Sequence, residues 1–226
     1  MIEIISHCWG FSKALCYQLS SLYTYSGPDE AKVTVFYSRE DELTVKMLRF
    51  FEPLLGEMLN PWEVPKSDLL RRSIGRHKAA VSSNADIVWF CDCDYYFGEG
   101  CLAALNSMVW HDSHKIHYPR EVLANNTREL GDEYSARVTR PSVVRVNVED
   151  FFPQKVRKAI GGLQIVTGSV AKSGYLGDHR RLQMPVTDGK WKPTTEDVRY
   201  RKTLGDSAIR LPNLFRIRQS IQGQCD

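Results

Sequence analysis

Apolar positions change their spacing along this chain, and the changes mark alternating strands and helices. Short apolar runs, several of them β-branched, predict strands over 2–6, 32–37 and 87–91. Between these runs apolar residues recur every three or four positions, as Leu15 and Leu19 do, which predicts helices. The alternation predicts an α/β fold with a mostly parallel central sheet flanked by helices, joined by right-handed crossovers.

Weaker patterns extend this prediction to the end of the chain, with one exception. Residues 119–158 are polar and show no clear period, which predicts an irregular functional loop or a lid over a site. A capping box is predicted at Ser38-x-x-Asp41. The remaining predicted helices lie over 42–51, 67–81 and 102–108 and from residues 170 and 195, and the remaining strands near 57–59, 115–118, 161–166 and 209–211.

Composition restricts the class of protein only broadly. The 226 residues are 42% hydrophobic and 25% charged, which fits one globular domain. Thirty Lys and Arg residues against 27 Asp and Glu residues give a net charge of +3, which neither indicates nucleic-acid binding nor excludes an anionic substrate. Six cysteines without a C-x-x-C pair, no signal-peptide pattern and no apolar run of about 20 residues predict a cytoplasmic protein with reduced thiols.

Two carboxylates one residue apart, Asp92 and Asp94, follow the most apolar predicted strand. In an extended segment they point to the same side, so a cation or hydrogen-bond donors must compensate their charge. Mg²⁺ prefers carboxylate and phosphate oxygens, and open α/β sheets bind ligands at the carboxyl ends of their strands. The pair therefore predicts a metal–diphosphate site, and the alternative is an aspartate-rich turn where the strand ends.

Basic residues and one histidine on the helix predicted from residue 67 have both a functional and a structural interpretation. Arg76 belongs to a basic cluster that could face an anionic ligand, although such clusters are more often solvated helix faces. His77 lies near the apolar face of the helix, where a hydrogen-bonded core histidine is the structural alternative. Arg216, in the basic C-terminal stretch, could reach a diphosphate or belong to a solvated end.

Acidic residues begin the last predicted helix. Glu196 and Asp197 follow two threonines, and Thr194-x-x-Asp197 fits a capping box, with acidic residues favoured in a first helical turn. A catalytic carboxylate is the functional alternative, and the residues alone leave both interpretations open.

The order of these motifs resembles that of glycosyltransferases of the GT-A fold, in particular the large inverting family 2. Residues 119–158 lie outside the match. The segments that resemble the family are, in chain order, Ile4-Ile5-Ser6 with the helix that reaches Leu22, Gly75 to Ala80, Asp92 to Leu102, Gly161-Gly162 through Asp178, and Thr195-Glu196-Asp197.

The resemblance implies a donor site for a nucleotide-diphosphate sugar, with a UDP-sugar favoured. Asp94 would coordinate Mn²⁺ or Mg²⁺ that bridges the diphosphate, and Asp92 would hold the ribose or a metal-bound water. Arg76 and Arg216 would stabilise charge on the leaving diphosphate. The other residues that the resemblance assigns to the donor site are Ser6 and His77.

The resemblance also implies the reaction, which is metal-dependent, non-processive transfer of one sugar to a hydroxyl acceptor. Asp197, with Glu196 beside it, would be the general base, and in-line attack would invert the anomeric configuration. A single domain would divide into a nucleotide-sugar-binding half (1–118), a loop or lid over the acceptor (119–158) and an acceptor-side, catalytic-base half (159–226). The acceptor could be a glycan, a lipid, a protein side chain or a modified nucleobase.

Three departures from the family pattern leave the nucleotide base open and argue against a processive enzyme, and two other classes of protein stay open as well. Tyr37-Ser38-Arg39 stands where the family carries base-reading acidic residues, His77 replaces an asparagine, and the Gln-x-x-Arg-Trp motif of processive synthases is missing. A nucleotidyltransferase would use a similar carboxylate-bound metal, but it would release pyrophosphate. A non-catalytic nucleotide-sugar-binding module would keep the fold without needing the three aspartates.

Overall fold

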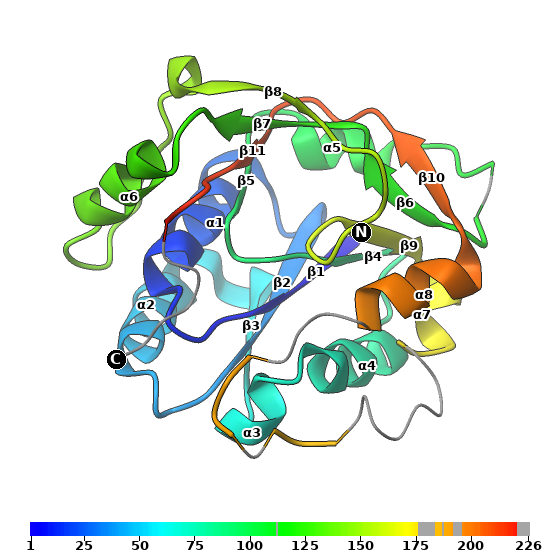
Figure 1. The fold of residues 1–226 in the computed structure, drawn as a ribbon, viewed down its shortest axis with the longest axis horizontal. Helices are drawn as coiled ribbons and strands as arrows, with labels where there is room; N and C mark the ends of the chain where they lie inside the picture. The colour runs from blue at the N-terminus through cyan, green and yellow to red at the C-terminus, as the bar shows by residue number, and fades with distance from the viewer. Residues whose placement is uncertain (112, 176–183, 187, 192–195, 221–226) are drawn as a thin grey trace.

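The computed structural model of the protein describes residues 1–111, 113–175, 184–186, 188–191 and 196–220. Among these, seven strands form one sheet in the order β10-β6-β9-β4-β1-β2-β3 (Figure 1). Their bounds are β1 (Ile2–His7), β2 (Ala31–Tyr37), β3 (Leu59–Glu63), β4 (Ile87–Phe90), β6 (Ile116–Pro119), β9 (Gln164–Thr167) and β10 (Asp206–Ile209).

A smaller sheet and eight α-helices complete the described part of the fold. The four strands of the smaller sheet, in the order β5-β11-β7-β8, are β5 (Tyr95–Phe97), β11 (Leu214–Arg216), β7 (Glu121–Asn125) and β8 (Phe151–Lys155). The helices are α1 (Ser12–Tyr25), α2 (Glu42–Leu55), α3 (Lys66–Leu69), α4 (Arg72–Ser82), α5 (Cys101–Asn106), α6 (Arg128–Arg137), α7 (Gly168–Lys172) and α8 (Glu196–Leu204), with 3-10 turns at Gly56–Met58 and Val148–Asp150.

The large sheet is mostly parallel, as the sequence pattern predicts. Strand β9 runs antiparallel to its neighbours β4 and β6, while every other neighbouring pair in this sheet is parallel. Helices α4, α7 and α8 gather on one side of the molecule, and the smaller sheet runs along the opposite side (Figure 1). The α/β architecture with flanking helices is therefore confirmed.

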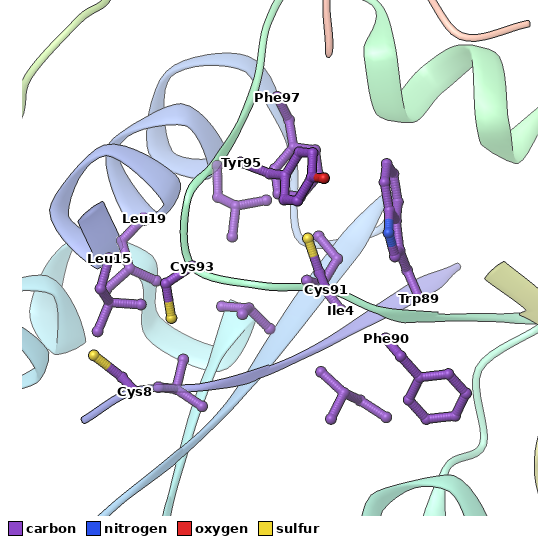
Figure 2. Close-up of a cluster of buried hydrophobic side chains, with 14 of the residues drawn as sticks. Ile4, Cys8, Leu15, Leu19, Trp89, Phe90, Cys91, Cys93, Tyr95 and Phe97 are labelled. Carbon is purple, nitrogen blue, oxygen red and sulfur yellow. The ribbon is translucent and has the colours of Figure 1, made fainter. Parts of the chain in front are cut away.

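Strand β4 lies in the middle of the large sheet and is buried along its whole length. Figure 2 shows Trp89 and Phe90 pointing to opposite sides of this strand, with Ile4 of the neighbouring β1 close by. Both faces of β4 are covered, and its four residues are all apolar, as is typical of a strand buried on both sides. Asp92 and Asp94 come shortly after the strand ends at Phe90.

The prediction that 119–158 is irregular was wrong. This segment contains β7, helix α6 and β8, and β7 pairs with β11 from the end of the chain. The burial of β7 and β8 does not alternate regularly: Val122, Ala124 and Asn125 are buried, while the last four residues of β8 are all exposed. Strands this short without a regular alternation of apolar and polar residues show no clear period, so the pattern missed them.

Several predicted boundaries also shift. Asp41, not Ser38, caps α2, because its Oδ1 accepts a hydrogen bond from the backbone N–H of Thr44 at 3.1 Å. The strand expected near 57–59 is Leu59–Glu63, and the one expected at 209–211 is Asp206–Ile209. Gly161 and Gly162 precede their strand rather than start it, since β9 begins at Gln164.

Glu3 joins three parts of the large sheet from within the core. Glu3 is only 4% exposed, and its carboxylate accepts hydrogen bonds from Thr34 Oγ1 at 2.7 Å and Ser83 Oγ at 2.5 Å. Lys32 Nζ lies 3.2 Å away. Because β1, β2 and the turn before β4 all contact this one carboxylate, it supports the register of the strands that carry the site.

We therefore expect Glu3→Ala to lower the free energy of unfolding by about 2–4 kcal/mol, because it leaves buried hydroxyls and an ammonium group without their acceptor. Urea unfolding of the variant measures this loss, with Glu52→Ala on the exposed face of α2 as the matched control. Equal stability of the two variants would contradict the structural role of Glu3.

Candidate active site

The polar residues of the site collect at the carboxyl ends of β1 and β4. Directly after β4, Asp92 forms ion pairs with two arginines of α4: Arg72 Nη1 lies 2.9 Å and Arg76 Nη2 lies 3.5 Å from its Oδ1. Arg76 is fully buried, so its charge requires this carboxylate. The Arg76 interpretation as a solvated helix face therefore does not describe the structure.

Asp94 has a different partner and one vacant acceptor atom. Arg216 of β11 donates from Nε to Asp94 Oδ2 at 2.9 Å. Among the described residues, the buried Oδ1 of Asp94 has no hydrogen-bond partner. An unpaired carboxylate oxygen in a buried position is expensive, so this atom is suited to a cation or a donor from a ligand.

The two carboxylates differ in how their surroundings affect the proton equilibrium. Burial alone would raise the pKa of Asp92, but the guanidinium groups of Arg72, Arg76 and Arg216 hold it below its ordinary value. Burial raises the pKa of Asp94, and the negative charge of Asp92 adds to this while Arg216 opposes it. Asp94 is thus the carboxylate with the less compensated charge.

A cavity of about 240 Å³ opens over these side chains. His7 contributes an unexpected polar wall: it stacks on Phe36 at a centroid distance of 4.8 Å, and neither ring nitrogen has a partner among the described residues. Burial and the charges of Arg76 and Arg72 lower the pKa of His7 well below its ordinary value, so the ring is neutral. The residues that line the cavity are His7, Phe11, Arg72, Asp92, Cys93, Asp94, Trp191, Arg216, Ile217 and Gln219.

A side chain of helix α1 holds the backbone of the turn Asp92-Cys93-Asp94 in place. Gln18, which is fully buried, donates from Nε2 to the Asp92 carbonyl oxygen at 3.0 Å. Its Oε1 accepts from Ser6 Oγ of β1 at 2.9 Å. Ser6 therefore acts on the site through Gln18, and the structure does not place its hydroxyl in the cavity lining.

A glycine turn brings Asp197 towards Asp92. A Cβ atom built on Gly161 would lie 3.6 Å from Asp197 Oδ2 and 4.0 Å from Asp92 Oδ2, so the two carboxylates face the same turn. One built on Gly162 would lie only 2.8 Å from Asp92 Oδ2. Because glycine has no side chain, the backbone at Gly162 can approach the Asp92 carboxylate more closely than any other residue could.

Buried hydrogen bonds connect the turn, α4 and α8. Arg76 donates to the Gly161 carbonyl oxygen at 2.8 Å and to Tyr175 Oη at 3.1 Å. Tyr175 donates in turn to Gln164 Oε1 at 2.9 Å, and Gln164 Nε2 donates to the Asp197 carbonyl oxygen at 3.0 Å. A chain of hydrogen bonds thus links the guanidinium group of Arg76, which pairs with Asp92, to the backbone of Asp197.

The structure brings together some predicted residues and separates others. Asp197 Oδ1 accepts from the Val198 N–H at 2.7 Å, so it also supports the start of α8. Glu196 is 2% exposed and its Oε2 has no partner among the described residues. His77 lies against Gly174, outside the lining of the cavity, and Thr195 and residues 176–178 lie outside the described residues.

Sequence reasoning did not single out several residues of the site. In the sequence, Arg72 was only one member of a basic cluster. For His7, the only indication of a role in the site was its position at the carboxyl end of β1. Gln18, Gln164 and Tyr175 carry no recognisable motif, because their partners come from distant segments and only the folded chain places them together.

The side-chain oxygen atoms of the site meet only part of the coordination that a hard divalent cation requires. Asp94 offers a buried, unpaired oxygen, and Asp92 stands beside it, but no group of three or more metal-binding side chains exists among the described residues. A cation held there would therefore need further ligands from water or a substrate phosphate, which is how Mg²⁺ is usually bound.

Comparison with solved structures identifies the fold. Over 99% of this chain and 60% of the other, the structure is similar to residues 1–349 of S. aureus TarS in complex with UDP-GlcNAc, with a TM-score of 0.61 and 12% identity. It is also similar to the mannosyltransferase PcManGT from Pyrobaculum calidifontis in complex with GDP-Man and Mn²⁺, over 96% of this chain and 56% of that one, with a TM-score of 0.53 and 14% identity.

These similarities establish a GT-A-type glycosyltransferase fold and no more, since so few residues are identical. The chain spans 36% of a longer TarS structure that it also matches. No family model and no curated protein matches the sequence. In the part of the chain that the structure describes, no helix is both long and apolar enough to cross a membrane.

The glycine turn provides a matched pair of variants. We expect Gly162→Ala to cost about 1–3 kcal/mol of stability, because the new methyl group meets the Asp92 carboxylate and the Tyr95 ring at less than 3.0 Å. Gly161→Ala makes only ordinary contacts, so we expect a change below about 1 kcal/mol. Urea unfolding of both variants tests the geometry, which equal losses would contradict.

Proposed function

We propose that this protein is a metal-dependent glycosyltransferase that moves one sugar from a nucleotide-diphosphate sugar to a hydroxyl acceptor with inversion. The observation that carries the proposal is the convergence of Asp92 and Asp197 on Gly161, beside a cavity lined by Asp94, Arg72 and Arg216. Arg72, Arg216 and Asp94 in the cavity wall suit the binding of a diphosphate with a cation. Asp197, a separate carboxylate next to the cavity, suits the role of a base.

In the donor half of the site, Asp94 would hold Mn²⁺ or Mg²⁺ through its unpaired Oδ1, with Asp92 contacting the ribose or a metal-bound water. A cation bound there supplies positive charge to the diphosphate as it leaves. Arg216 and Arg72 line the same cavity, so their guanidinium groups would bind phosphate oxygens after releasing part of their contact with the carboxylates. The comparison proteins bind UDP-GlcNAc and GDP-Man, and we propose a UDP-sugar here.

In the acceptor half, Asp197 would take the proton of the acceptor hydroxyl as its oxygen attacks the anomeric carbon. Oδ1 already accepts a backbone hydrogen bond, which leaves Oδ2, the oxygen nearest Gly161, to receive the proton. The hydrogen bond from Gln164 to the Asp197 carbonyl oxygen holds the base in place. Attack from the side opposite the leaving diphosphate would invert the anomeric configuration.

Donor binding should depend on a divalent cation and on Asp94. We expect calorimetry to detect UDP binding with Mn²⁺ but not with EDTA, and Asp94→Ala to weaken it at least about tenfold because the cation loses its carboxylate. Asp86→Ala is the control, since Asp86 lies before β4 and pairs with the N-terminal amine. A repeat with GDP tests the base, and UDP binding that is unchanged by EDTA would remove the metal from the proposal.

Replacing the proposed base should separate binding from chemistry. We expect Asp197→Asn to lower the transfer rate by about 10²-fold or more while UDP affinity is kept, because an amide cannot accept the proton. If Asp197 only supports the start of α8, the amide oxygen can still accept the Val198 hydrogen bond and activity should remain.

The measurement is transfer rate, UDP affinity and melting temperature on the same preparation, with the exposed Asp29→Asn as control. Product analysis serves a second purpose, since release of pyrophosphate from a nucleoside triphosphate would instead identify a nucleotidyltransferase. Near-normal transfer by a folded Asp197→Asn variant would refute the assignment of the base.

A further inference from the structure

A second hollow of about 250 Å³ lies between the small sheet and the segment that leads into the glycine turn. Its floor is apolar and its rim is strongly basic. The residues that line it are Tyr95, Val122, Gln154, Lys155, Val156, Arg157, Lys158, Ile160, Leu163 and Arg216.

Four cations line this hollow, and one of them, Arg216, forms an ion pair with Asp94. Lys155, Arg157 and Lys158 are exposed, and within the described residues no ion pair joins any of them to a carboxylate. Glu121 is opposite Lys155 in the pairing of β7 with β8, yet it does not line the hollow. From residue 151 to residue 177 the sequence contains no Asp or Glu.

The hollow adjoins the Asp92–Asp94 cavity through a thin wall. Arg216 lines both spaces, and its guanidinium carbon lies 5.5 Å from the centre of the Tyr95 ring, which faces the hollow. Gly162 fills the gap between Tyr95 and the Asp92 carboxylate, and Ile160 precedes the turn that Asp197 faces. A group held in the hollow would therefore lie beside the turn that Asp92 and Asp197 face.

We propose that this basic hollow is the acceptor subsite, and that it selects a hydroxyl acceptor carrying a phosphate or carboxylate group. The proposal rests on the glycosyltransferase function proposed above. The donor diphosphate is assigned to the neighbouring cavity, so the three rim cations are available to a second anion. Phosphate and carboxylate oxygens accept several hydrogen bonds from lysine and arginine, while an uncharged sugar would gain little from them.

The test compares acceptors that share one skeleton. Glucose, glucose 6-phosphate and glucuronate are titrated into the full chain with saturating UDP and Mg²⁺, and binding is followed by saturation-transfer NMR. We expect at least one of the two anions to bind about tenfold more tightly than glucose. Which anion does so distinguishes a phosphate from a carboxylate partner.

Charge reversal then locates the binding. Lys155→Glu/Lys158→Glu should abolish the preference for the anion, whereas Arg49→Glu/Lys172→Glu, an equal charge change at exposed positions elsewhere, should keep it. Lys155→Gln/Lys158→Gln serves if the reversal impairs folding. Equal binding of all three sugars to the wild type, or a preference that survives charge reversal, would overturn the subsite.

Donor turnover keeps this result separate from the proposed function. Release of UDP from UDP-glucose or UDP-GlcNAc by the wild type without acceptor tests the donor half of the site alone. An anion preference that needs Lys155 and Lys158, without UDP release from any donor, would support the anion subsite and refute the glycosyltransferase. UDP release that no anion accelerates, together with equal sugar binding, would refute only the subsite.

Discussion

The cost of removing two carboxylates from water governs the arrangement of this site. Asp92 and Asp94 follow a strand that is covered on both faces, so water cannot fully solvate them. Arginines from two distant elements, α4 and β11, supply the opposite charge. The compensation is uneven, because Asp92 has two arginine partners and Asp94 has one and keeps an unpaired oxygen. The metal proposed here would bring positive charge to Asp94 and complete the balance.

The small sheet has more than a covering role. Its strand β11 carries Arg216 to Asp94, and β11 is held between β5, which follows the aspartates directly, and β7. The chain passes from the large sheet to the small one between β4 and β5, at Arg120 between β6 and β7, and between β10 and β11. A segment whose polar sequence indicated a loop is therefore the structure that positions a charged partner of the site and forms the basic hollow beside it.

Buried amide and hydroxyl groups control the relative positions of the carboxylates. Gln18 holds the backbone of Asp92 from α1, and Gln164 holds that of Asp197 from β9. Each of these amides makes at least two hydrogen bonds in the core, so a shift of either carboxylate would leave buried polar groups unpaired. The distance between the donor and acceptor halves of the proposed reaction thus depends on side chains that carry no charge.

The sequence by itself determined the alternation of strands and helices and the position of Asp92 and Asp94 after an apolar strand, because strands covered on both faces typically carry near-continuous apolar runs. It also indicated Arg76, Asp197 and Arg216, although each pattern fitted a structural role at least as well. Only the tertiary structure decided which arginine pairs with which aspartate, and that His77 lies outside the cavity while His7 lines it. Those pairings join residues up to 122 positions apart, and local periodicity contains no information about such contacts.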